Sequence, residues 1–286
     1  MIFTTRFAPS PTGPLHLGHA YSALMAHEMA RAARGRFLLR IEDIDQSRAR
    51  PEWEARIYDD LRWLGLDWET PVRRQSEHLD AYRQALETLW SLGLLYPCGC
   101  NRRDILAAAS APQEGGEPAV GPDGLIYPGT CRPRTPPSGQ MPVDQALRLD
   151  MRRALGHLGA RTLEFEETGQ TPRKVSITHD DLINDTGDIV IARRDMGTSY
   201  HLSVVVDDAA QGISHVVRGQ DLFDATRIHV VLQRLLGLPS PVYHHHRLIR
   251  DAAGKRLAKR DDARAIATYR DQGDTPADIR RRVGLP

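Results

Sequence analysis

Apolar positions alternate and cluster in a strand–helix–strand order at the start of the chain. Short apolar runs predict strands at residues 2–8 and 37–41. Longer segments with helical periodicity predict helices at residues 17–34, 52–64 and 79–92. A helix between two strands favours a parallel sheet, so this half of the chain predicts an α/β fold.

The pattern changes in the middle of the chain and then resumes. Residues 107–142 are rich in Ala, Gly, Pro, Ser and Glu, which predicts a long exposed loop. Further apolar segments follow. They predict strands at 146–151, 189–193, 199–206, 215–217 and 242–248, and one helix at 225–236. After residue 259 only two short helical stretches are predicted.

This order predicts a sheet that is interrupted by an insertion. We expect four parts: a first half of an α/β domain (1–94), an inserted subdomain (95–185), the second half (186–260) and a short helical extension (261–286). No further domain is expected after the extension.

Composition narrows the class of protein. The chain has 286 residues, 41% hydrophobic and 26% charged, which is typical of a globular protein with one large or two modest domains. It shows neither a signal sequence nor an apolar run that could cross a bilayer, so a cytoplasmic protein is expected. The net charge is only +1, but residues 247–286 carry nine Arg and two Lys against six Asp, a balance of +5. This excess suits a phosphate backbone, although a solvated helical tail explains it equally well.

The turn after the first predicted strand carries two histidines. His16 and His19 are three residues apart, where a helix begins, so both side chains should face one side of the first turn. From there they can donate hydrogen bonds to a pentacovalent phosphate, helped by the positive end of the helix. The alternative is a capped helix start with incidental histidines.

Lysine is rare in this chain, which makes its position informative. There are three lysines against 35 arginines, and Lys255 and Lys259 lie in one loop after a predicted strand. A compact, mobile point charge suits a moving phosphate, and Lys259 is our candidate. A basic surface turn is the alternative.

Both motifs resemble a known family. The run His16-Leu17-Gly18-His19 resembles the HIGH signature of class I aminoacyl-tRNA synthetases, and its Pro-rich lead resembles the glutamyl subgroup. Residues 256–260 resemble the KMSKS loop, with Ala258 where serine is common and Arg256 in place of lysine, which should tune the loop. The resemblance implies a catalytic domain with a Rossmann-like parallel sheet, split by an inserted, zinc-containing subdomain. It also implies that no anticodon-binding domain follows the short helical extension.

The same resemblance implies the site residues. Glutamate would be bound by Arg6, Ser10, Glu42, Tyr200 and Arg218, and ATP by Pro9, His16, Gly18, His19 and Lys259, of which His16, His19 and Lys259 are catalytic. The chemistry agrees, because arginine binds carboxylates in a fork and a carboxylate pairs with an ammonium.

Several of these residues could instead have purely structural roles. Arg6 could pair with Asp43, Glu42 could cap a turn and Tyr200 could simply pack. The carboxylates of residues 42–45 could also bind a metal, a minor alternative. Of three adjacent histidines, at 244–246, one is expected to line the ATP site and the others to lie in loop or surface.

The three cysteines predict a metal site rather than disulfides. Cys98, Cys100 and Cys131 supply three thiolates, one ligand short of a tetrahedral zinc site. Resemblance to the truncated branch of the family, the glutamyl-queuosine tRNA(Asp) synthetases, implies Tyr127 as the fourth ligand of one structural zinc. Reduced buried cysteines are the alternative.

That branch implies a two-step ligase. Glutamate reacts with magnesium-bound ATP to give glutamyl-adenylate, and the glutamyl group is passed to queuosine in the anticodon of tRNA(Asp). A monomer without membrane contact is expected. The alternatives are a short glutamyl-tRNA synthetase charging a 3′ end, a HIGH-type adenylyltransferase acting without RNA, and an RNA-binding protein that has lost catalysis.

Overall fold

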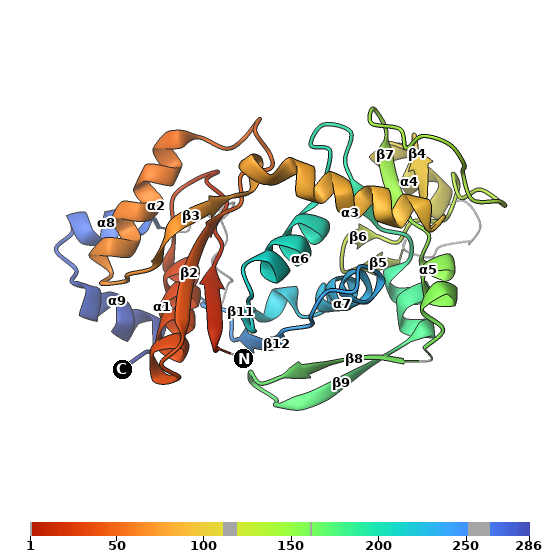
Figure 1. The fold of residues 1–286 in the computed structure, drawn as a ribbon. Helices are drawn as coiled ribbons and strands as arrows, with labels where there is room; N and C mark the ends of the chain where they lie inside the picture. Colours follow the sequence, from red (N-terminus) through yellow and green to blue (C-terminus); the bar gives the residue numbers. More distant parts are fainter. Residues whose placement is uncertain (1, 111–118, 161, 251–263) are drawn as a thin grey trace.

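The N-terminal part of the chain forms the predicted parallel sheet. The computed structural model describes residues 2–110, 119–160, 162–250 and 264–286. Strands β1 (Thr4–Phe7), β2 (Arg36–Ile41) and β3 (Glu69–Arg74) lie side by side in that order, all parallel. Helices α1 (Leu17–Ala32) and α2 (Pro51–Trp63) connect them (Figure 1). The predicted strands at 2–8 and 37–41 and the helices at 17–34 and 52–64 are thereby confirmed.

A second sheet lies beside the first and is formed by later segments of the chain. Its strands are β11 (His215–Gly219), β12 (Val242–His246), β8 (Thr162–Glu167) and β9 (Arg173–Thr178), in that order. The strands β11, β12 and β8 are parallel, and β8 and β9 form an antiparallel hairpin. The amide of Ser214, just before β11, donates to the carbonyl of Thr4 at 3.0 Å. Segments about 210 residues apart in the sequence therefore meet where β1 and β11 run side by side.

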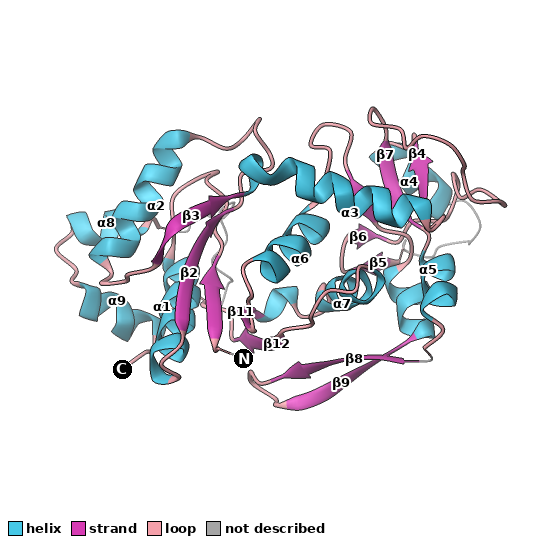
Figure 2. Ribbon diagram, viewed as in Figure 1, coloured by secondary structure: helices cyan, strands magenta, loops and turns pink. Residues whose placement is uncertain are grey.

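The inserted part is built on an antiparallel sheet. Helix α3 (Leu79–Ser91) runs from the N-terminal sheet toward β4 and β7 (Figure 2). Strands β4 (Leu95–Cys98), β7 (Ala146–Leu149) and β10 (Val190–Ala192) pair in the order β10-β7-β4. The remaining elements of this part are α4 (Arg102–Ser110), β5 (Val120–Gly121), β6 (Gly124–Leu125), α5 (Met151–Leu158) and the π-helical turn η2 (Asp181–Thr186).

Strand pairing does not follow the predicted limits of the insertion. The β8–β9 hairpin, inside the predicted range 95–185, joins β12 of the second sheet. Conversely β10, outside that range, pairs with β7. The two parts share strands, and the four-part division stays a prediction.

Two local expectations are wrong. Residues 199–206, read as extended, begin helix α6 (Tyr200–Ala210), whose N-cap Ser199 accepts a hydrogen bond from the amide of Leu202. Its apolar run is buried on several sides, and periodicity alone does not separate such a helix from a buried strand. The predicted loop at 107–142 contains the end of α4 and the small β5–β6 hairpin. The sequence analysis also missed β8 and β9.

The last segment packs against helix α1. The elements after β10 that complete the fold are η3 (Gln220–Leu222), α7 (Thr226–Leu235), α8 (Ile266–Asp271) and α9 (Pro276–Val283), and η1 (Gln75–His78) precedes α3. Helix α9 begins with a capping box between Thr275 and Asp278, and its buried Ile279 and Val283 join the core around α1. The two predicted C-terminal helices are thus confirmed. In the described part of the chain no helix is long and apolar enough to cross a bilayer.

Candidate active site

The two histidines begin helix α1 and stack on each other. The Nδ1 atom of His16 accepts from the amide of Gly18 at 3.1 Å, and that of His19 accepts from the amide of His16 at 3.2 Å. Their ring centroids are 3.8 Å apart. Because both Nδ1 atoms accept, each neutral ring carries its proton on Nε2, the donor form that a phosphate oxygen requires. The expected placement on one side of the first turn is confirmed.

A cavity of about 350 Å³ opens in front of these histidines. It lies at the ends of β1, β2 and β11 and at the start of α6, the edge where α/β sheets bind ligands. Its predicted lining residues are His16, Gly18, His19, Arg6, Glu42, Tyr200 and Arg218. Ser10 lines the neighbouring, larger cavity, and the backbone carbonyl of Pro9 accepts from the amide of Glu42 at 3.0 Å. Lys259 lies outside the described residues.

Arg6 and Glu42 belong to a buried network of charges. Arg6 Nε donates to Asp208 Oδ1 at 3.0 Å, and Arg40 Nη1 donates to the same oxygen at 2.7 Å. Arg40 also reaches Glu42 Oε1 at 3.2 Å and lies 3.8 Å from Asp207. The suggested pair of Arg6 with Asp43 is wrong. The Asp43 carboxylate instead accepts hydrogen bonds from the backbone amide and the hydroxyl of Ser76, in the turn before α3.

Burial and charge act in opposite directions on the pKa values of this network. Burial raises the pKa of Glu42 more than the neighbouring Arg40 and Arg6 lower it, so the net shift is upward. For Asp208 burial acts the same way, but the two guanidinium groups outweigh it and the pKa is lowered. The sequence analysis missed Arg40 and Asp208. The available signal was an arginine inside the apolar strand at 37–41.

Arg218 faces the same cavity from β11 and is held by neutral groups. Its Nε donates to His245 Nε2 at 3.1 Å and its Nη2 to Thr226 Oγ1 at 2.7 Å. Its Nη1 lies 3.2 Å from Nδ1 of His229. Tyr200 completes this side of the cavity, and burial raises its pKa.

The three adjacent histidines lie in β12 rather than in a loop. One of them, His246, lines the cavity in front of His16 and His19, with Nε2 2.6 Å from Ser22 Oγ, and its place in an ATP site stays a prediction. His244 is half-buried. His245 is fully buried and lies 2.5 Å from Glu167, so its assignment to loop or surface is wrong. Strand alternation turns His245 toward the sheet interior while its neighbours point the other way.

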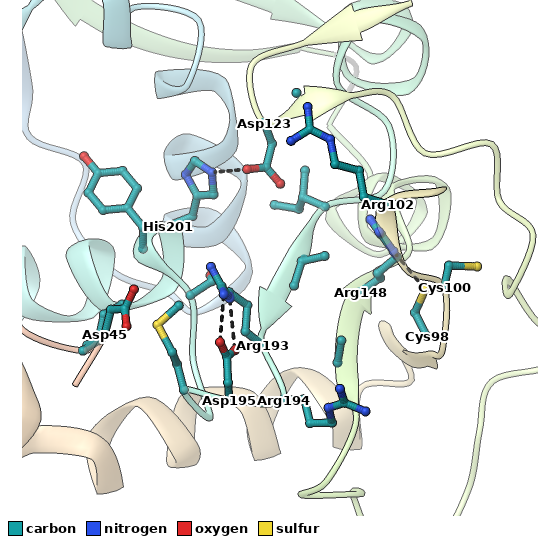
Figure 3. Close-up of a pocket in the computed structure, with 18 of the residues that line it drawn as sticks. Asp45, Cys98, Cys100, Arg102, Asp123, Arg148, Arg193, Arg194, Asp195 and His201 are labelled. Atoms are coloured by element: carbon teal, nitrogen blue, oxygen red, sulfur yellow. Dashed lines mark hydrogen bonds and ion pairs between the residues drawn. The ribbon is translucent and has the colours of Figure 1, made fainter. Parts of the chain in front are cut away.

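A larger cavity of about 1010 Å³ adjoins the first one. Glu42 and Tyr200 line both cavities, so the two meet at these residues. Its wall carries five arginines, Arg48, Arg102, Arg148, Arg193 and Arg194, several of which Figure 3 shows around the opening. Arg193 is paired with Asp195 at 2.8 Å.

The four predicted metal ligands come together at the edge of this cavity. The Sγ atoms of Cys98, Cys100 and Cys131 all lie within 4.8 Å of one another, and Tyr127 Oη is 3.5 Å from the first two. Ligands at ~2.0–2.3 Å from a shared tetrahedral zinc lie roughly 3.5–3.8 Å apart, so this donor set fits the ion. Without a metal ion the pKa shifts in this cluster point in different directions: the hydrogen bond from Tyr127 lowers the pKa of the Cys131 thiol to about 7, whereas burial raises the pKa of Tyr127 and the pKa of Cys100 is also raised. Arg148 packs over the Tyr127 ring, with its guanidinium carbon 3.8 Å from the ring centroid.

The fold and these motifs define a class of protein. Residues 3–118 and 168–285 match the model for the catalytic domain of class I tRNA synthetases, the E and Q group. The chain belongs to this family. The unmatched segment, 119–167, holds β7, α5 and two of the four clustered ligands, Tyr127 and Cys131.

Individual relatives narrow the comparison. The chain is 64% identical over 283 residues to the glutamyl-Q tRNA(Asp) synthetase of Rhodobacter capsulatus, covering 98% of this chain and 99% of that one. It is 43% identical over 267 residues to the glutamyl-Q tRNA(Asp) synthetase of Geobacter sulfurreducens, covering 93% of this chain and 78% of the relative.

Solved structures agree with the fold. A glutamate tRNA ligase from Elizabethkingia meningosepticum, in complex with its amino acid, superimposes with a TM-score of 0.73 at 27% identity. That match covers 96% of this chain and 59% of the ligase, so the chain spans less than two thirds of that enzyme. A methionyl-tRNA synthetase from Mycobacterium tuberculosis matches with a TM-score of 0.59 at 12% identity, which supports the fold alone.

Proposed function

We propose that this chain activates glutamate with ATP and transfers the glutamyl group to queuosine in the anticodon of tRNA(Asp). The observation that carries the proposal is one cavity in which the His16–His19 pair faces Arg6, Glu42, Tyr200 and Arg218. A phosphate-binding histidine pair and a pocket with cations for carboxylates and a carboxylate for an ammonium are what amino-acid activation requires. The relatives named glutamyl-Q tRNA(Asp) synthetase support the acceptor.

In the first step an oxygen of the glutamate α-carboxylate attacks the α-phosphorus of magnesium-bound ATP. The bond from this phosphorus to the bridging oxygen breaks, and pyrophosphate leaves. Nε2–H groups of His16 and His19 stabilise the charge that develops on the phosphate oxygens. Catalysis comes from positioning and electrostatics, since the chemistry needs no protein nucleophile.

In the second step the acceptor nucleoside attacks the acyl carbon of the adenylate, and AMP leaves. We assign the larger cavity to the RNA, because it meets the smaller one at Glu42 and Tyr200. Its wall carries five arginines that can contact phosphates and six carboxylates, so the wall as a whole is not positively charged. The enzyme is proposed to act as a cytoplasmic monomer. The alternative acceptor, a tRNA 3′ end, is the one suggested by the glutamate tRNA ligase likeness.

The cluster of Cys98, Cys100, Tyr127 and Cys131 is proposed to hold one structural zinc ion. When bound, zinc would tie β4 to the loop that carries Tyr127 and Cys131, at the edge of the RNA cavity. Metal analysis of the purified protein should give about one zinc per chain. If a chelator removes the zinc and the melting temperature of the protein does not change, the structural role is contradicted.

The proposed function is tested by glutamate-dependent ATP–pyrophosphate exchange without RNA. Labelled glutamate is then offered with tRNA(Asp) that contains or lacks queuosine. Exchange without RNA and queuosine-dependent transfer are expected. Exchange that requires tRNA(Glu) would instead favour a short glutamyl-tRNA synthetase, and no exchange at all would favour a non-catalytic protein.

Lys259 is proposed to stabilise the α-phosphate transition state and the leaving pyrophosphate. Lys259→Ala should lower the rate of adenylate formation by orders of magnitude, on the order of 10²–10³-fold, while glutamate binding changes little. Single-turnover adenylate formation and equilibrium binding of glutamate measure the two effects. Equal loss of both would contradict this role.

A further inference from the structure

Arg218 lies where two chains of hydrogen bonds meet. Its Nε donates to His245 Nε2 at 3.1 Å, and its Nη1 lies 3.2 Å from His229 Nδ1. Among the described residues no carboxylate forms an ion pair with Arg218, whereas Arg6 and Arg40 both pair with Asp208. The positive charge of Arg218 is therefore buried at the cavity wall among neutral acceptors.

The donor pattern fixes the proton on each histidine. A guanidinium group has no acceptor, so the histidine nitrogen that faces it must accept. His245 then carries its proton on Nδ1 and donates to Glu167 Oε2 at 2.5 Å. His229 carries its proton on Nε2 and donates to His201 Nδ1 at 3.2 Å.

The second chain ends on a carboxylate in the larger cavity. With its Nδ1 accepting, His201 donates from Nε2 to Asp123 Oδ1 at 3.3 Å, the contact drawn in Figure 3. Two relays thus run outward from the guanidinium, one to Glu167 and one to Asp123. Each ends on a negative charge that is separated from Arg218 by at least one neutral imidazole.

Burial and the nearby cation keep both clamping histidines neutral. Burial, with the charge of Arg218 as a second cause, lowers the pKa of His245 to about 4 and that of His229 well below its ordinary value. Local packing also fixes Glu167. A Cβ on Gly169 would lie 2.2 Å from the carbonyl oxygen of His245 and 2.6 Å from Glu167 Oε1, so any larger residue would push this carboxylate away.

We propose that His229 and His245 are positioning residues, which hold Arg218 through neutral acceptors and thereby keep its full charge for a carboxylate of the substrate. This inference rests on the proposed activation of glutamate. A carboxylate in place of either imidazole would also orient the guanidinium, but it would compete with the substrate for the same donors and the same charge. Neutral acceptors give the orientation without that competition.

The test compares substitutions at His229 that are similar in shape and differ in charge. In His229→Asn the amide oxygen can take the place of Nδ1 as acceptor, whereas His229→Asp adds a carboxylate next to Arg218. In ATP–pyrophosphate exchange at pH 8 we expect the KM for glutamate of the Asn variant to stay within about threefold of the unmodified protein. In the Asp variant it should rise at least about tenfold, with the KM for ATP unchanged.

His27 provides the matched control. It is a buried histidine in α1 that contacts Asp67 and lines neither cavity. His27→Asn and His27→Asp should give equal KM values for glutamate, whatever their effect on the melting temperature. If the Asp variant at position 229 does not fold, His245→Gln and His245→Glu make the same comparison at the Nε atom of Arg218, which donates to His245.

The outcomes separate this inference from the proposed function. Absence of glutamate-dependent exchange in the unmodified protein would overturn the function itself. Normal exchange with equal KM values for glutamate in the Asn and Asp variants would overturn only the positioning role. A charge-dependent rise confined to glutamate supports it, because a merely structural role would affect both substrates alike.

Discussion

Arg6 on β1 and Arg218 on the neighbouring strand β11 line one cavity, and they are held in opposite ways. Arg6 is paired directly with Asp208, which also binds the fully buried Arg40. Arg218 is held by two histidines and a threonine hydroxyl. One side of the pocket is thus neutralised within the protein, whereas the other keeps a net positive charge.

The difference indicates how the two sides divide their work. Around Arg6 the close charges stabilise one another, and the arrangement fixes Glu42 where an ammonium can meet it. Around Arg218 no direct ion pair is formed among the described residues, and in our proposal a carboxylate of the substrate supplies the negative charge. The first side should therefore matter most for stability and the second for affinity.

The largest effect is expected at Asp208. Asp208→Ala leaves Arg6 and Arg40 buried without their shared carboxylate, and breaking a buried pair in this way costs about 3–5 kcal/mol. Urea denaturation should show this loss in the free energy of unfolding. Asp60→Ala, which removes a buried carboxylate of α2 remote from the cavity, should cost much less. Equal losses would break the comparison.

Arg218→Ala should act mainly on glutamate. Loss of a charge-assisted contact with a carboxylate is worth ~1.5–3 kcal/mol, so the KM for glutamate should rise roughly 10- to 100-fold. The KM for ATP, measured in the same exchange assay, should stay nearly constant. An unchanged KM for glutamate would exclude Arg218 from the pocket.

The pH dependence of glutamate binding should report on Glu42. Its pKa is raised by burial against the opposing charges of Arg40 and Arg6, with Tyr200 and Asp208 also nearby. The Glu42 carboxylate is charged above its pKa and becomes neutral as the pH falls through it, so the KM for glutamate should rise as the pH is lowered. Because the pKa of Glu42 is raised, this rise should begin at a higher pH than for a glutamate with an ordinary pKa. Glu42→Gln should give a higher KM for glutamate, and that KM should change less with pH between roughly pH 5 and pH 8. A profile as steep as that of the unmodified protein would assign the titration to another group.

The smallest effect is expected for Tyr200→Phe. Tyr200 lines both cavities, and this change removes its hydroxyl and keeps the ring. Loss of one hydrogen bond, ~1 kcal/mol, corresponds to a rise of about fivefold in the KM for glutamate. An effect larger than that of Arg218→Ala would reverse the proposed ranking of the two residues.

Local signals predicted much of the fold and part of the site. The strand–helix–strand start was visible because apolar spacing and the cap at His16 are properties of adjacent residues. The same holds for the His16–His19 pair. Helix α6 was missed because its apolar run is buried on several sides, and tertiary contact overrides weak local preference in such a segment. The β8–β9 hairpin pairs residues that are close in the sequence, and the alternation of Leu163 and Phe165 with polar residues was a local signal that the sequence analysis did not use.

The sequence alone determined which chemical groups are available: two histidines at a helix start, three thiols with a tyrosine, and acids and arginines at strand ends. Only the tertiary structure decided which charges cancel. Asp208 lies 202 residues from Arg6 in the chain, and His245 lies 27 residues from Arg218. Electrostatic energy depends on distance and burial in space, and neither can be read from the order of residues along the chain.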